Sequence, residues 1–256
     1  MNAPLLSSAL IILSALIFVA LERRYPYTPG QRFLRQGFWM DLVLYSLVQN
    51  WVLGKIIELI IHGIDLRAAG RLHLVGGWPV PLQAVFFLVL HDIYIYWFHR
   101  LQHRVPFLWR IHEAHHSTPH VDWLSGTRSH SLEILINQTI EFAPLFLLGA
   151  PPEIGYFKVT IDAIWGMYIH SNINVRSGWL QKIFNGPEMH RWHHALEVVN
   201  VNFSTKIAVW DWVFGTAYLP GTKPKQYGLE PTSAYPVNSY VWQHLIAFRR
   251  RRSETA

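Results

Sequence analysis

Apolar residues are concentrated in five stretches of the chain, separated by segments rich in polar and charged residues. Residues 5–21 contain only apolar side chains and serines. A helix rises about 1.5 Å per residue, so about 20 such residues cross the hydrocarbon core of a bilayer. The remaining stretches are residues 38–61, 81–98, 131–150 and 154–169. This pattern predicts an all-α fold, a multi-pass transmembrane helical bundle.

The first stretch has the flanks of a membrane anchor. A secretory signal peptide places Lys or Arg before its apolar run and a small-residue cleavage site after it. Here Arg23 and Arg24 follow the run, and no convincing cleavage site is present. We therefore expect an uncleaved first helix whose N-terminus lies outside the cell.

The distribution of basic residues predicts the orientation of the bundle. Five passes from an outer N-terminus place residues 22–37, 99–130 and 171–256 on the cytoplasmic side. These segments hold eighteen of the 22 Lys and Arg residues, whereas the outer segments hold only Arg67 and Arg71. Cytoplasmic loops of membrane proteins carry such an excess. The same excess accounts for the net charge of +6 without a nucleic-acid partner, and the small chain without an ER-retention signal favours a bacterial inner membrane.

The composition narrows the possible chemistry. The chain has 256 residues, 51% of them hydrophobic and 15% charged, against about 25% charged in an average soluble domain. The absence of cysteine excludes disulfides, thiolate metal sites, iron–sulfur clusters and cysteine nucleophiles. Histidine is unusually frequent, because twelve of the fifteen histidines lie between His91 and His194.

Eight of these histidines form three short strings. Residues three and four apart share one face of a helix, so each string directs two or three imidazoles to the same side. Pro106 separates the first two strings, and Asn185, Gly186 and Pro187 predict a helix start before the third. An even number of passes separates the second string from the third, so all three reach the same side. The strings are His99 and His103; His112, His115 and His116; and His190, His193 and His194.

The number of imidazoles exceeds the needs of one metal ion. First-row ions take about four to six ligands, so eight histidines indicate two ions. Imidazole suits iron, zinc, copper and nickel, and the residues alone do not choose among them. The sequence thus predicts a cytoplasmic, histidine-rich helical cap on the membrane bundle.

The chain resembles the fatty acid hydroxylase/sterol desaturase superfamily, whose members are membrane-bound di-iron oxygenases. The similarity covers about residues 82–218 and includes the three strings, the run from Asp92 to Arg100, the histidine motif at His170 and the closing segment from Trp210 to Thr216. It implies a domain division into N-terminal transmembrane helices (1–80), a catalytic domain (81–218) and a loop with a basic amphipathic tail (219–256).

The resemblance also implies the site. Two iron ions, with zinc as a possible substitute, would use O2 and external electrons to hydroxylate or desaturate a sterol, fatty acyl or related lipid. The electron donor would be a separate protein such as a ferredoxin or cytochrome b5, and Arg100, Arg104 and Arg110 are the expected docking residues. The implied metal ligands are the eight histidines of the strings together with His170.

The sequence departs from the family around His170. Some relatives have another histidine four residues away, where this chain has Gly166 and Asn174. The second ion is therefore expected to have fewer protein ligands, or to use Asn174 or water. Metal-bound histidines commonly donate their second ring N–H to a carboxylate or carbonyl. We expect supporting roles of this kind for Asp92, Glu113, His130, Glu188 and Asp211.

Two other functions fit part of the pattern. Residues 112–116 also match the H-E-x-x-H motif of zinc peptidases, with Glu113 as general base and His112 and His116 as ligands. That function leaves the first and third strings without a role. A non-enzymatic metal carrier needs ligands along a path through the membrane, whereas the three strings are predicted at one side.

Overall fold

The computed structural model describes residues 2–67, 72, 74–230, 233 and 235–249. Within these residues the protein is helical and has no extended strand; three isolated bridges, such as Pro26 with Ile173, tie loops together. The all-α prediction is confirmed. The long helices are α1 (Ala3–Arg24), η1 and α2 (Met40–Gln49 and Asn50–Arg67), α3 (Val80–Gln102), α5 (Ser131–Leu147) and α6 (Pro152–His170).

Three of the five expected passes are long and apolar enough to cross a membrane. These are Ala3–Arg24, Met40–Ile64 and Val80–Gln102. The other two stretches are also helices, but α5 has only 17 residues and α6 carries Glu153, Lys158 and Asp162. The two helices form a hairpin, so the chain returns to the same end of the bundle whether or not the hairpin crosses the bilayer.

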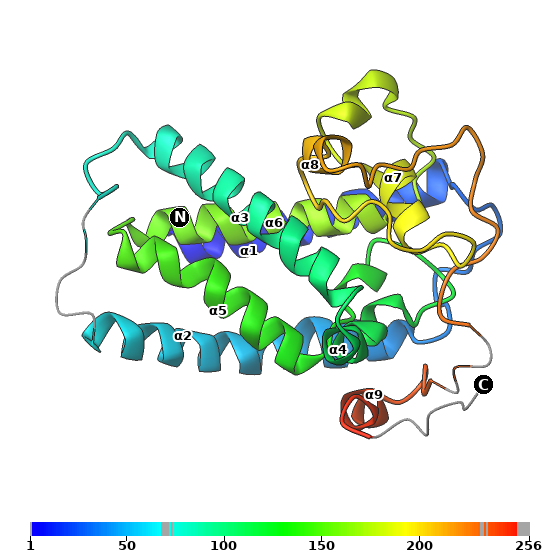
Figure 1. Cartoon of the computed structure of the whole chain (residues 1–256), viewed down its shortest axis with the longest axis horizontal. Helices are drawn as coiled ribbons and strands as arrows, with labels where there is room; N and C mark the ends of the chain where they lie inside the picture. The colour runs from blue at the N-terminus through cyan, green and yellow to red at the C-terminus, as the bar shows by residue number, and fades with distance from the viewer. Residues whose placement is uncertain (1, 68–71, 73, 231–232, 234, 250–256) are drawn as a thin grey trace.

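The long helices pack in parallel and crossing pairs (Figure 1). Helix α1 lies along α6, α2 lies along α5, and α3 crosses both α5 and α6. Helix α1 buries only Ser7 and Glu22. The Ser7 hydroxyl lies 2.6 Å from the Thr160 hydroxyl, which ties α1 to α6. The apolar side chains of α1 face outward, as expected for a helix surrounded by lipid.

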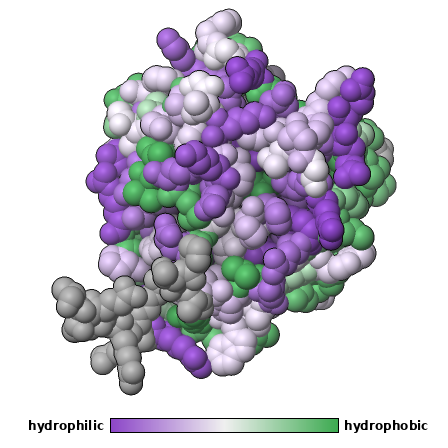
Figure 2. All heavy atoms as spheres, turned by 90° about the vertical axis from the view of Figure 1, so that its right-hand side faces the viewer, coloured by the Kyte–Doolittle hydropathy of each residue, from purple (hydrophilic) through white to green (hydrophobic). Residues whose placement is uncertain are grey.

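The short helices gather at one end of the bundle, opposite the turn between α5 and α6 (Figure 1). Figure 2 views this end, where hydrophilic side chains predominate and hydrophobic ones lie mainly along one flank. A surface of this kind is suited to water and lipid headgroups rather than to hydrocarbon. The short helices are α4 (Pro106–His116), η2 (Ser125–Thr127), η3 (Gly178–Lys182), α7 (Pro187–His193), α8 (Val209–Val213) and α9 (Tyr240–Ile246).

The predicted amphipathic tail forms α9. Its apolar side chains Val241, Trp242, Leu245 and Phe248 are exposed, whereas Gln243 is buried against the body of the protein. This division is typical of a helix that lies in the membrane interface. The remaining arginines of the tail, Arg250, Arg251 and Arg252, lie outside the described residues.

A buried ionic network fixes the histidine end to the N-terminal helices. The Asp41 carboxylate lies between two guanidinium groups: Arg35 Nη1 is 2.7 Å away, and Arg128 Nε donates to its other oxygen. Arg35 also donates through Nη2 to Asp122 at 2.8 Å. All four side chains are buried. The charge of Arg128 therefore depends on Asp41 for its neutralisation, whereas Arg35 is shared between Asp41 and Asp122.

Replacing Asp41 with Ala is expected to lower the free energy of unfolding by about 3–5 kcal/mol, because it leaves the buried Arg128 charge without a carboxylate partner. Thermal unfolding of the purified protein in detergent measures the loss. Glu230 is exposed, and Glu230→Ala serves as a control that changes stability by less than about 0.5 kcal/mol. Equal melting temperatures for the two variants would contradict the structural role of Asp41.

Candidate metal centre

Each histidine string lies where a helix begins or ends at the hydrophilic end of the bundle. His99 is in the last turn of α3, and His103 is its C-cap residue. Helix α4 starts at Pro106 and carries the second string in its last turns. Helix α7 starts at Pro187 and carries the third string, with His194 at its C-cap. The helix start predicted at Pro187 is confirmed.

The nine histidines expected to bind metal come together in two groups. Within each group, the nitrogens that face one another all lie within 4.8 Å. The first string lies wholly in the first group, the second and third strings are divided between the groups, and His170 at the end of α6 completes the second group. The first group is His99, His103, His112, His116 and His193; the second is His115, His170, His190 and His194.

Within each group, ring nitrogens of different histidines point at one another. In the first group, His99 Nε2 lies 3.1 Å from His112 Nε2. In the second, His170 Nε2 lies 3.0 Å from His190 Nε2 and 3.2 Å from His194 Nε2. One ring N–H cannot satisfy several such contacts at once. A cation between the lone pairs satisfies all of them.

The protonation state of the rings also favours the binding of a cation. The Nε2 atoms of His103, His116 and His193 are buried and have no hydrogen-bond partner among the described residues. Burial holds the pKa of His116 and of His193 well below the usual 6.5. These imidazoles are therefore neutral at physiological pH, which is the form that binds metal.

Two rings of the first group are oriented by one loop. His99 Nδ1 lies 2.8 Å from the Phe203 carbonyl oxygen, and His193 Nδ1 lies 2.8 Å from that of Val201. The Asp211 carboxylate holds this loop by accepting the backbone N–H groups of Phe203 and Ser204. Asp211 thus supports the site through the loop and not through a histidine ring.

A buried carboxylate orients a third ring. His112 Nδ1 lies 2.8 Å from Glu133 Oε1, which also accepts a hydrogen bond of 2.7 Å from Gln102 Nε2. The sequence analysis did not identify Glu133 or Gln102. Glu133 lies in the first turn of α5, and Gln102 is the last residue of α3. Glu133 is 21 positions from His112 and 31 positions from Gln102 in the sequence, so no local spacing pattern predicts these contacts.

Two rings of the second group, His115 and His170, are oriented by backbone carbonyls. His115 Nδ1 lies 3.0 Å from the Arg128 carbonyl oxygen, and His170 Nδ1 lies 2.8 Å from that of Gly166. Gly126 packs directly on His170: a Cβ atom at position 126 would lie 2.5 Å from His170 Nδ1. Only glycine leaves room for the ring in this place, and the sequence analysis did not identify it.

The other residues expected to support the site lie farther from it. Asp92 is fully buried and accepts hydrogen bonds from the backbone of Lys206 and Ile207 and from the Trp210 indole. It therefore anchors the segment that follows the Phe203 loop. Glu113 is buried on α4 and belongs to neither group.

Three further side chains are also outside both groups. His130 caps the start of α5 by accepting from the Leu132 N–H. Glu188 lies in the first turn of α7 and accepts from the Gln181 side chain. Asn174 is exposed and lies outside the second group. The possible metal ligands of that group are therefore its four imidazoles.

A third cluster of possible ligands lies between α3, α5 and α6. It contains His91, Glu141 and Asp162, which the sequence analysis did not assign. Two lysines already neutralise its carboxylates: Lys158 contacts both, and Lys206 Nζ lies 2.8 Å from Asp162. The cluster is charge-balanced without a metal ion and is best described as a buried ionic contact that joins the helices.

The chain is similar in sequence to a known protein family over the region that contains the histidine groups. The family model described as fatty acid hydroxylase matches residues 84–216. The ornithine lipid hydroxylase OlsE of Rhizobium tropici is 35% identical over 145 residues, which cover 56% of this chain and 44% of that protein. Human alkylglycerol monooxygenase is 30% identical over 151 residues, covering 58% and 32%.

A third relative has a different stated activity. The Delta(7)-sterol 5(6)-desaturase erg3C of Aspergillus fumigatus is 26% identical over 145 residues, covering 48% of this chain and 45% of that protein. The chain thus spans less than half the length of these curated relatives, and no solved structure matches it. The family match extends over more than half of the chain and includes all nine clustered histidines, and on this basis the chain belongs to the fatty acid hydroxylase family.

Proposed function

We propose that this protein is a membrane-bound oxidoreductase that uses two iron ions, O2 and externally supplied electrons to hydroxylate or desaturate a lipid. The observation that carries the proposal is the division of nine histidines, eight of them buried and His103 half-buried, into adjacent groups of five and four. The similar proteins are named as a lipid hydroxylase, an alkylglycerol monooxygenase and a sterol desaturase. Their names support a lipid substrate for this chain.

Iron ions bound by the two groups would supply the reductive activation of O2 that oxidation of an unactivated C–H bond requires. The contribution of the chain is to prepare the ligands. Carbonyl oxygens of Val201, Phe203 and Arg128 accept hydrogen bonds from Nδ1 atoms. These bonds fix the tautomer with its lone pair on Nε2, so the ligand atoms are oriented before an ion arrives.

The membrane helices support access for a lipid substrate. Helix α1 is exposed along almost its whole length, and the first half of α3 has an exposed apolar side. The last turn of α3 carries His99, and His103 follows as its C-cap. A bilayer-dissolved chain can therefore approach the histidine groups without leaving the membrane. We place this end of the bundle in the cytoplasm of a bacterial cell, on the strength of the basic residues that surround it.

The geometry favours an oxygenase over a zinc peptidase. A catalytic zinc ion commonly has three protein ligands and an open position. His112 and His116 do lie in one group, but they share it with three further imidazoles. His115 belongs to the other group, which has no task in peptide hydrolysis.

Metal analysis and two substitutions distinguish these activities. Purified protein is expected to contain about two iron ions per chain. His190→Ala should abolish formation of the oxidised lipid, because it removes a ligand of the second group. Lipid profiling of cells with and without the gene measures this product. Glu113→Gln should retain both iron ions and most of the activity. One zinc ion per chain, or loss of activity only in Glu113→Gln, would favour the peptidase.

Gly126 offers a test of the second group alone. Gly126→Ala is expected to displace His170, because the new methyl group would lie 2.5 Å from its ring, and to weaken binding of one ion roughly 10- to 100-fold. Titration with a chelator measures the change as early release of half of the iron. Gly221→Ala has open space around the added methyl group and is the control. Identical release curves would show that His170 does not need this glycine.

The electron donor is expected to bind at the corner between α3 and α4. The chain has no cysteine for an iron–sulfur cluster, so we propose a separate acidic donor of the ferredoxin or cytochrome b5 kind. Arg104 is exposed there, and Arg100 and Arg110 are half-buried beside it. Opposite charges accelerate protein association at low salt.

Replacing these three arginines with Gln is expected to slow reduction by an acidic donor about tenfold at low ionic strength and to weaken its salt dependence. Stopped-flow measurement of the second-order rate constant gives both values. A control with the same change of net charge replaces three exposed residues elsewhere, Arg176, Lys182 and Lys225. An equal effect in the two triple variants would indicate that the arginine corner is not the docking site.

A further inference from the structure

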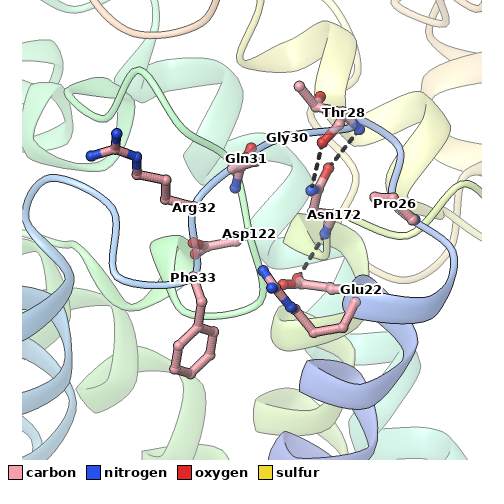
Figure 3. A pocket seen from close by; sticks show the side chains of 10 residues that line it. Glu22, Pro26, Thr28, Gly30, Gln31, Arg32, Phe33, Asp122 and Asn172 are labelled. Carbon is pink, nitrogen blue, oxygen red and sulfur yellow. Dashed lines mark hydrogen bonds between the residues drawn. The ribbon is translucent and has the colours of Figure 1, made fainter.

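A polar cavity of about 440 Å³ lies at the end of the first membrane-spanning helix (Figure 3). Glu22 and Arg23 from the last turn of α1 form one side. The segment that follows α1 arches over the cavity and contributes Gln31 and Arg32. None of the functions described so far uses this cavity.

Two residues that line the cavity lie close in sequence or contact to the second histidine group. Asn172 follows His170 by two residues. Asp122 follows Val121, whose carbonyl accepts a hydrogen bond of 3.1 Å from Arg191, and Arg191 also donates to the Ser171 carbonyl at 2.7 Å. The cavity therefore adjoins the chain segments that carry His170 and His190.

The position of the cavity corresponds to the headgroup level of a membrane. Helix α1 is long and apolar enough to cross a bilayer and ends at Arg24. Arginines and aromatic residues at such an end lie among the lipid headgroups. Phe33, exposed at the edge of the cavity, is a further apolar contact at this level.

The acidic residues of the cavity wall have hydrogen-bond partners, whereas two of its arginines have no ion-pair partner in the described part of the chain. Asp122 accepts hydrogen bonds from Arg35 on both carboxylate oxygens. Glu22 Oε1 accepts the backbone N–H groups of Trp123 and Asn172, each at 2.7 Å. Among the residues that the structure describes, Arg23 and Arg32 have no carboxylate within ion-pair distance. Two exposed arginines thus line the cavity without an ion-pair partner among the described residues, whereas both carboxylates already accept hydrogen bonds.

We propose that this cavity binds the anionic group, a phosphate or carboxylate, in the headgroup of the lipid that the enzyme oxidises. Guanidinium groups bind such oxyanions through paired, charge-assisted hydrogen bonds. The volume is within the range of pockets for small polar molecules. This assignment of a substrate class rests on the lipid oxidation proposed above, but the binding step can be measured without it.

The test uses the full-length protein in detergent and dihexanoylphosphatidylglycerol as the probe. Arg23→Gln combined with Arg32→Gln is expected to weaken its binding at least about tenfold, the effect of losing a charge-assisted hydrogen bond. Arg24→Gln combined with Lys182→Gln removes the same charge outside the cavity and should leave the affinity unchanged. Equal affinities in the two double variants would overturn the proposal.

Two further probes identify the source of the anion. Dihexanoylglycerol, which lacks the phosphate, should bind at least about tenfold more weakly than the phospholipid, and inorganic phosphate should not compete with it at the same concentration. Tight binding of dihexanoylglycerol, or full competition by phosphate, would overturn the assignment to a lipid headgroup. Because no oxidation is measured, a negative result leaves the proposed oxygenase intact, and protein without iron would still give a positive result.

Discussion

The structure depends on the concentration of nine neutral imidazoles in a space that excludes water. A buried polar group without a hydrogen-bond partner costs about 1–3 kcal/mol, and the Nε2 atoms of His103, His116 and His193 are in that position. Hydrogen bonds from the opposite ring nitrogen to backbone carbonyls, such as those of His193 with Val201 and of His99 with Phe203, offset part of this cost. The protein therefore accepts a locally unfavourable interior to hold ligand atoms ready, as expected where function and stability compete.

The sequence predicted the parts of this arrangement that are local. Helical spacing placed His112, His115 and His116 on one turn, and Pro187 marked the start of α7. The convergence of the three strings followed from the parity of the membrane passes. It did not require knowledge of whether α5 and α6 cross the bilayer, since a hairpin returns to the same end in either case.

The supporting contacts were not predictable in the same way, because they join distant segments. Glu133 was an unremarked acidic residue in an apolar helix until the fold placed it 2.8 Å from His112. Asp92 and Asp211 were predicted to support metal-bound histidines directly. Their side chains, however, hold the 203–210 segment, whose backbone in turn orients His99. Sequence chemistry identified the residue types, but only the tertiary structure defines which atom each one contacts.

The Glu22 carboxylate has a consequence for the behaviour of the protein in different membranes. One oxygen of this side chain holds the segment after α4, through Trp123, and the segment after α6, through Asn172. Helix α1 packs along α6, and most of its remaining surface is apolar and exposed. A bilayer of different thickness would favour a different tilt of such a helix, and Glu22 would transmit the change to the two segments that flank His116 and His170. Acyl-chain length in the surrounding membrane thus becomes a mechanical input to the histidine groups.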